Sequence, residues 1–258
     1  MNTINENPLT YLITFFSIYS FLGWLTEVIY AYHKDHSFVN RGFLYGPLCP
    51  IYGSGIIIII LCLNNYKNNI SLIFLIGMLL TSSLEYITGF ILEKAFNTKW
   101  WDYSDMPLNL HGRICMSFSI IWGIASIFIV SFVHPLVSNL ISNIPLFIVQ
   151  IYALIFFIYF ILDFTFTMLS LIKFNKFIIQ ILKSKEELMN KIANFHPNFT
   201  EENNLQIDNL KIKYHDLISK LHSNHIRLLK AFPAITSNKD IFLLKEMKDI
   251  LLKYKNRK

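Results

Sequence analysis

Residues that could carry out chemistry are gathered in two stretches of this chain. They are FVNRGFLYGPLCPIYG, residues 38–53, and WWDYSDMPLNLHGRIC, residues 100–115, and we call them the first and the second motif stretch. Each combines Arg, Asn, Gly, Pro and aromatic residues, and each lies between apolar segments. Their arginines, Arg41 and Arg113, present planar five-donor guanidinium groups that suit a carboxylate or a phosphate. The two stretches therefore predict a polar site at a membrane boundary.

Four carboxylates lie inside the apolar segments: Glu27, Glu85, Glu93 and Asp163. A charge at the middle of a bilayer costs roughly 3 kcal/mol on insertion scales, so such groups usually face a partner or a water-filled cavity. At about 100° per residue, Glu85 and Glu93 share one face of their segment with other polar or small residues. Glu27 and Asp163 have similar neighbours on their own faces. We therefore expect three helices that each turn one polar face towards a common interior.

These acids and the two arginines are the core of a candidate polar cluster. The candidates for substrate binding, or for a polar cluster within the membrane, are Glu27, Asn40, Arg41, Glu85, Glu93, Asp102, Asn109, Arg113 and Asp163. Three interpretations of the arginines are open. They pair with Glu27 and Glu93 and hold the helices together, they flank an anionic substrate or lipid headgroup, or they only set the topology.

Motifs of several common chemistries do not occur in the sequence. None of the nine glycines begins GxxxxGK[ST], the phosphate-binding loop of many ATPases, and neither HExxH nor GxSxG is present. Cys49, His111 and Cys115 lack the spacing of metal ligands, so we expect no metal site, and we expect no cofactor. No catalytic residue is assigned. An enzyme built on this chain would have to use Glu, Asp and Arg at an intramembrane or interfacial site.

The composition predicts an integral membrane protein in contact with the lipid bilayer. Of the 258 residues 53% are hydrophobic and 16% are charged, against about 25% charged in soluble proteins. Spans need about 20 apolar residues, and the candidates are residues 9–32, 47–63, 70–96, 114–133 and 145–172. The fourth is expected to end before His134 and Pro135. Residues 47–63 are barely long enough, so a short, broken or partly re-entrant helix is open there.

We therefore expect an all-α, polytopic membrane bundle of about five transmembrane helices, residues 1–175, followed by a basic helical tail, residues 176–258. Lys and Arg in the short flanks number one on the side of the N-terminus and five on the other side, before the tail is counted. The positive-inside rule then places the N-terminus outside the cell membrane, and the C-terminus and both motif stretches in the cytoplasm.

The tail carries most of the positive charge. Seventeen of the 23 Lys and Arg residues follow residue 172, and a basic tail beside anionic lipid requires no nucleic-acid partner. Apolar or small residues recur at a period close to 3.5 over residues 210–231, and Asn238 can cap a final amphipathic helix. We expect a helical hairpin or a segment through which copies of the chain associate.

Long segments of the chain resemble a known bacterial family. The resemblance is carried by FLGWLTEVIY, FVNRGFLYGPLCPIYG, LEYITGFILEKAF, WWDYSDMPLNLHGRICMSFSIIWG and, in the tail, NHIRLLKAFP. These segments are similar to the ABC transporter permease family of type IV, also called CmpB-like. The resemblance implies a membrane-spanning subunit that relies on a separate ATPase subunit. The EAA-type coupling motif of importer permeases is not found between the spans.

Three functions follow as hypotheses. The first is an ABC-transporter-type permease subunit of unknown substrate. The second is an interfacial enzyme or binder that acts on lipid or cell-envelope phosphate groups, with the arginines holding the phosphate and a carboxylate transferring a proton. The third is a membrane scaffold that recruits a partner through its tail. Of these the permease subunit is the prediction.

Overall fold

The computed structural model describes residues 7–36, 38–63, 66, 68–96 and 98–193, together with residues 208, 209, 212, 227, 236 and 237. The helices are α2 (Pro8–Asp35), α3 (Pro50–Leu63), α4 (Ile70–Phe96), α5 (Met116–Phe128), α6 (His134–Ser142) and α7 (Leu146–Ala193). A π-helical segment, η2 (Ile129–Val133), joins α5 to α6, and the strands are β1 (Thr98–Lys99), β2 (Asn109–Leu110), β3 (Ile114–Cys115) and β4 (Thr236–Ser237). The expected all-α membrane bundle is confirmed.

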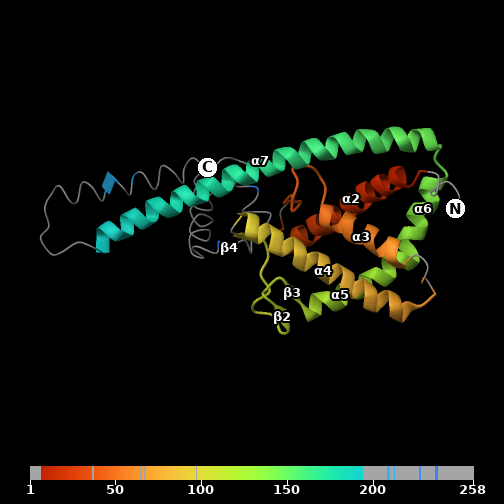
Figure 1. Ribbon diagram of the computed structural model, residues 1–258, viewed down its shortest axis with the longest axis horizontal. Coiled ribbons are helices and arrows are strands. Elements are labelled where there is room, and N and C mark those ends of the chain that lie inside the picture. Colours follow the sequence, from red (N-terminus) through yellow and green to blue (C-terminus); the bar gives the residue numbers. More distant parts are fainter. Residues whose placement is uncertain are drawn as a thin grey trace, which may run out of the picture.

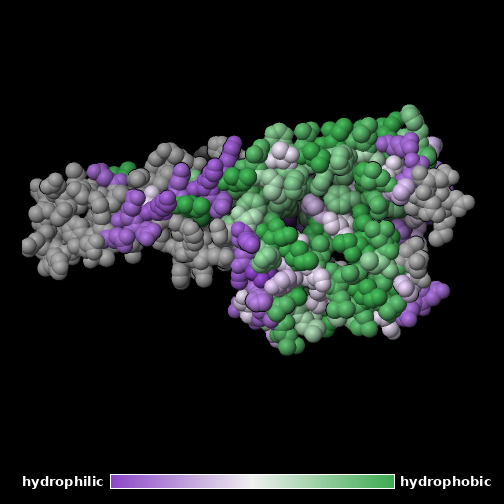
Figure 2. Space-filling model, viewed as in Figure 1, coloured by the Kyte–Doolittle hydropathy of each residue, from purple (hydrophilic) through white to green (hydrophobic). Residues whose placement is uncertain are grey.

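Both motif stretches lie at one end of the bundle, which we call the motif end. Helix α2 leads to this end, α3 leads away from it, α4 returns to it and α5 leaves it again (Figure 1). The ring of Phe43 in the first motif stretch contacts that of Trp100 in the second, edge to face with centroids 5.7 Å apart. The surface between the two polar ends of the bundle is largely hydrophobic (Figure 2).

Within the described residues, four helical segments are long and apolar enough to cross a membrane: 8–34, 70–96, 116–142 and 146–181. The fifth expected span is the shorter helix α3, whose 14 residues extend about 21 Å at 1.5 Å per residue. Helix α3 packs closely on α2 because each offers a glycine at the crossing. A Cβ on Gly23 would meet the ring of Tyr52, and one on Gly53 would meet Ser20.

The fourth span was expected to end before His134, and this was wrong. The helix continues through η2 into α6, so that residues 116–142 form one apolar segment of 27 residues. Pro135 lacks the N–H that an α-helix would direct at the carbonyl four residues earlier. The π-helical segment η2, which has a wider turn, ends at Val133, and α6 begins at the next residue. Pro135 therefore lies in the first turn of α6, where a proline is tolerated.

Helix α7 is 48 residues long, which corresponds to about 72 Å. It runs beside the bundle and continues beyond the motif end, where its surface becomes polar (Figures 1 and 2). The expected boundary between membrane domain and tail, at residue 175, falls inside this continuous helix. The expected helices of the tail after residue 193 lie almost entirely outside the described residues.

The opposite end of the bundle carries an aromatic core. Tyr11, Phe15 and Tyr19 of α2 are buried there against Ile141 and Val149. The hydroxyl of Tyr19 lies 2.9 Å from Nδ1 of His134, which is itself buried. This end is therefore closed by packing among α2, α6 and α7.

Candidate functional site

Arg41 of the first motif stretch forms an ion pair with helix α2. Its Nε lies 3.6 Å from Oε2 of Glu27, and its guanidinium lies 5.5 Å from the ring centroid of Tyr30. The other carboxylate oxygen of Glu27 accepts a hydrogen bond from the hydroxyl of Tyr52 at 2.7 Å. Glu27 therefore joins the first motif stretch to both α2 and α3.

Arg113 of the second motif stretch forms a closer ion pair with helix α4. Its Nε and Nη2 donate to Oε2 of Glu93 at 3.0 and 2.8 Å, and its Nη1 donates to the hydroxyl of Tyr86 at 3.2 Å. The guanidinium also lies 5.2 Å from the ring centroid of Tyr86 and 5.3 Å from that of Phe90. Gly89 faces the same side chains, because a Cβ there would lie 3.5 Å from Arg113 and 3.2 Å from the ring of Trp101.

Asp163 of α7 binds the backbone of the first motif stretch. Its two oxygens accept the N–H groups of Tyr45 and Gly46 at 3.0 and 2.9 Å, and the side chain is buried in the protein. The hydroxyls of Tyr159 and Thr167, one turn away on either side, lie 3.4 Å from it. Hydrogen bonds from N–H groups to a carboxylate are among the strong ones in proteins, so Asp163 anchors this turn to α7.

Glu85 of α4 is buried, and its hydrogen-bond donors are neutral. Trp122 Nε1 donates to Oε2 at 3.1 Å, and the hydroxyl of Tyr103 donates to Oε1 at 3.2 Å. Burial and the nearby Glu85 carboxylate raise the pKa of Tyr103, so this phenol remains a donor. Beside Glu85, Ser82 donates to Ser119 at 2.8 Å and completes a polar contact between α4 and α5.

Asn40 shapes the first motif stretch. Its Oδ1 accepts from Trp24 Nε1 at 2.8 Å and from the Gly42 N–H at 2.9 Å, and its Nδ2 donates to the Tyr45 carbonyl at 2.9 Å. Asn40 therefore holds a turn of the first motif stretch.

Asp102 and Asn109 shape the second motif stretch in the same way. Asp102 accepts from the Ser104 N–H at 3.0 Å and from its hydroxyl at 2.5 Å, and Asn109 Nδ2 donates to the Met106 carbonyl at 2.8 Å. Burial opposes ionisation of Asp102, but the hydrogen bonds from Ser104 and the charge of Lys99 outweigh it and lower the pKa. Both candidates therefore have partners within the second motif stretch or next to it.

Each of the four intramembrane carboxylates thus contacts a motif stretch. Glu27 contacts Arg41, Glu85 contacts Tyr103, Glu93 contacts Arg113, and Asp163 contacts the backbone at residues 45–46. Both arginine–glutamate pairs of the first interpretation are present.

The pattern of residue types could not identify the neutral donors Tyr52, Tyr103 and Trp122, which resemble ordinary membrane-interface aromatics. Residue types also gave no role to Arg227 of the tail, which donates to backbone carbonyls of the first motif stretch. Its one signal in the sequence is its place in the segment NHIRLLKAFP.

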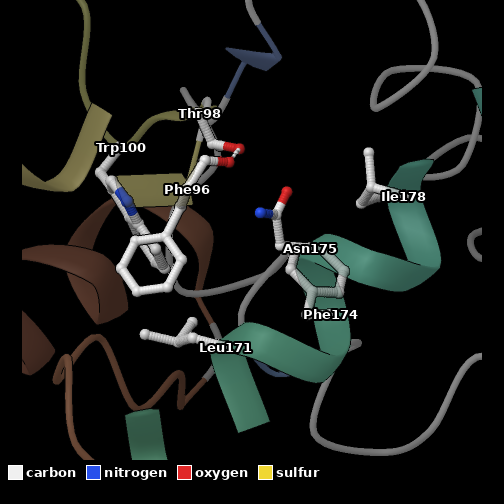
Figure 3. Close-up of a pocket in the computed structure, with 7 residues that line it drawn as sticks. All are labelled: Phe96, Thr98, Trp100, Leu171, Phe174, Asn175 and Ile178. Carbon is white, nitrogen blue, oxygen red and sulfur yellow. Dashed lines mark hydrogen bonds between the residues drawn. The ribbon is translucent and has the colours of Figure 1, made fainter. Parts of the chain in front are cut away.

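A small hollow lies next to the second motif stretch. Its lining residues are Phe96, Thr98, Trp100, Leu171, Phe174, Asn175 and Ile178, and it has room for about one water molecule. Figure 3 shows the amide of Asn175 reaching from α7 towards the segment that carries Thr98 and Trp100. Among the described residues, no group of three or more His, Cys, Asp or Glu side chains is placed to hold a metal ion.

Comparison with known proteins places the sequence in one family. The family model described as "putative ABC-transporter type IV" matches residues 14–168, which is more than half of the 258 residues. The match contains both motif stretches and all four intramembrane carboxylates. No curated protein and no solved structure matches the chain.

Proposed function

We propose a function on the premise that this chain belongs to the ABC-transporter type IV family of membrane proteins. It is the membrane-spanning, permease-type subunit of a transport system, and a separate ATPase subunit supplies nucleotide hydrolysis. The absence of a phosphate-binding loop from the sequence agrees with such a division of labour. The distribution of Lys and Arg supports a cytoplasmic position for the motif end, where an ATPase subunit would dock.

One observation carries this proposal: every intramembrane carboxylate is bonded to a motif stretch. A partner that displaces the second motif stretch must move α4 with it or break the contacts of Arg113 and Tyr103. A partner that displaces the first must act in the same way on α2 through Arg41 and on α7 through the 45–46 backbone. Both stretches are therefore suited to pass motion from a docked partner to the membrane helices.

The test is purification of the tagged full chain in mild detergent from its native host, with identification of the proteins that accompany it. We expect a stoichiometric ATPase subunit whose ATP hydrolysis depends on this chain. The Arg113→Ala variant should lower the ATP hydrolysis that this chain stimulates at least fivefold. Ser142→Ala, at an exposed position at the opposite end, should leave that hydrolysis unchanged. Purification without any ATPase would overturn the proposal.

The alternative is a site for lipid or cell-envelope phosphate groups at the motif end. Its support is that Arg41 and Arg113 lie at one end of the bundle, on two stretches in mutual contact. Both guanidinium groups are already within ion-pair distance of glutamates, so a phosphate would have to displace those partners. Co-purification of phospholipid in place of an ATPase, lost in Arg41→Ala, would favour this alternative over the permease subunit.

A further inference from the structure

The turn formed by residues 42–46 of the first motif stretch lies between two side chains of opposite charge. On one side is Asp163, which accepts the N–H groups of Tyr45 and Gly46. On the other is Arg227 of the tail. Its Nη1 donates to the carbonyls of Gly42 and Leu44, each at 3.0 Å, and its Nη2 lies 3.5 Å from the carbonyl of Phe43.

The two terminal nitrogens of Arg227 are bound by backbone carbonyls, whereas its buried Nε has no hydrogen-bond partner among the described residues. Three successive carbonyls converge on its two terminal nitrogens, and the guanidinium lies 5.0 Å from the ring centroid of Tyr45. Burial lowers the pKa of Arg227, while Tyr45 and the negative charge of Asp163 oppose that effect. A planar fork can serve several carbonyls and stack on a ring at once, which the compact ammonium of lysine cannot do.

A second contact joins the same tail to the other motif stretch. Strand β4 pairs antiparallel with β1, with Thr236 opposite Lys99 and Ser237 opposite Thr98. Strand β1 directly precedes the second motif stretch, and β4 follows Arg227 by nine residues. The tail therefore contacts both stretches at the motif end.

We propose that the backbone of residues 42–46 is a binding site for a guanidinium group, that its ligand is Arg227 of the same chain, and that the tail thereby clamps both motif stretches. The carboxylate of Asp163 and the guanidinium of Arg227 polarise the turn from opposite sides, so each strengthens the hydrogen bonds of the other. The inference does not rest on the transport function. If the tail clamps both stretches, any partner that binds at the motif end must either bind beside the tail or displace it.

The test is hydrogen exchange of the full-length protein in detergent, followed by mass spectrometry of peptides that cover residues 42–46. Arg227→Ala should speed exchange there at least tenfold, and Arg227→Lys should give an intermediate increase. Arg257→Ala is the matched control, since it removes the same charge from the same tail, and it should leave exchange unchanged. Unchanged exchange in Arg227→Ala would overturn the proposal.

A second measurement covers the case in which Arg227→Ala does not fold. Cysteines placed at Thr98 and Ser237 face each other across an antiparallel pair and are close enough for a disulfide. We expect this link within one chain on mild oxidation, identified by mass spectrometry because three native cysteines are present. Arg227→Lys should reduce its yield at least threefold. A link between two chains, or an undiminished yield in Arg227→Lys, would contradict the clamp.

Discussion

The two motif stretches have similar compositions but are held in different ways. The second has its own internal structure: β2 and β3 pair, the Tyr103 N–H donates to the Gly112 carbonyl at 2.7 Å, and Trp101 Nε1 donates to the Arg113 carbonyl at 2.8 Å. The first also has internal hydrogen bonds, which Asn40 makes to Gly42 and Tyr45, but its backbone is in addition bound by Asp163 from helix α7 and by Arg227 from the tail. The backbone of the first stretch therefore depends on side chains from two distant segments of the chain.

The largest effect that would test this difference is expected at Asp163. Asp163→Ala leaves two N–H groups of the first motif stretch without their carboxylate partner, and hydrogen bonds to charged groups contribute about 1.5–3 kcal/mol each. We expect a decrease of about 3 kcal/mol in the free energy of unfolding, measured by chemical unfolding in detergent micelles. Asp105→Ala, an exposed acid within the second motif stretch, should change it by less than about 0.5 kcal/mol. Equal losses of unfolding free energy in Asp163→Ala and Asp105→Ala would mean that the two stretches are not held in different ways.

The next effect compares the two ion pairs. Glu93→Gln breaks a pair at 2.8 Å between side chains that are 16% and 15% exposed, and should cost about 2 kcal/mol of unfolding free energy, since it leaves a half-buried guanidinium without its counter-charge. Glu27→Gln affects a pair at 3.6 Å, and should cost about 0.5 kcal/mol. The same unfolding measurement checks both variants. A larger loss for Glu27→Gln would show that side-chain charge holds the first stretch more strongly than the second.

A third, smaller effect concerns Gly46. A Cβ at this position would meet the hydroxyl of Tyr159 and the carboxylate of Asp163, so Gly46→Ala should lower the free energy of unfolding by about 1.5 kcal/mol, in the range for overpacked sites. Gly55→Ala, within helix α3, is the matched control. A Cβ at Gly55 would lie 3.3 Å from the side chain of Leu84, which can move away. That variant should be neutral or slightly stabilising. An unaffected Gly46→Ala protein would mean that the turn does not need its close approach to α7.

The smallest expected effect is a pH dependence of thermal stability that arises from Asp102 in the second motif stretch. The pKa of Asp102 is lowered in the folded protein, so its ionised form stabilises the fold above its unfolded pKa, and this contribution disappears as pH falls through the folded value. Asp102→Asn should therefore unfold at a lower temperature than the wild type at pH 7. The difference should begin to shrink as pH falls below about 4, the unfolded pKa, and should vanish only below the lower pKa of the folded protein. Thermal unfolding at several pH values measures it. A difference that stays constant as the pH is lowered through this range would contradict the assignment.

The sequence by itself determined approximately where most of the helices lie and that the two motif stretches share one end of the bundle. Long apolar segments must be helical in a bilayer, since every backbone N–H and C=O needs an internal partner there. Helical periodicity placed Glu85 and Glu93 on one face, and the fork of Arg113 suited the carboxylate that it meets. These expectations depend only on local geometry and on residue type.

Only the tertiary structure decided which partners those residues have. Asp163 binds backbone N–H groups, and every residue except proline carries one, so nothing in the residue types distinguishes Tyr45 and Gly46 as its partners. Arg227 reaches carbonyls that lie more than 180 residues earlier in the chain. The helix that passes Pro135 could not be foreseen either, because a proline ends one helix or begins another according to how the chain packs around it. Local patterns fix the elements, whereas contacts across the bundle depend on how those elements pack.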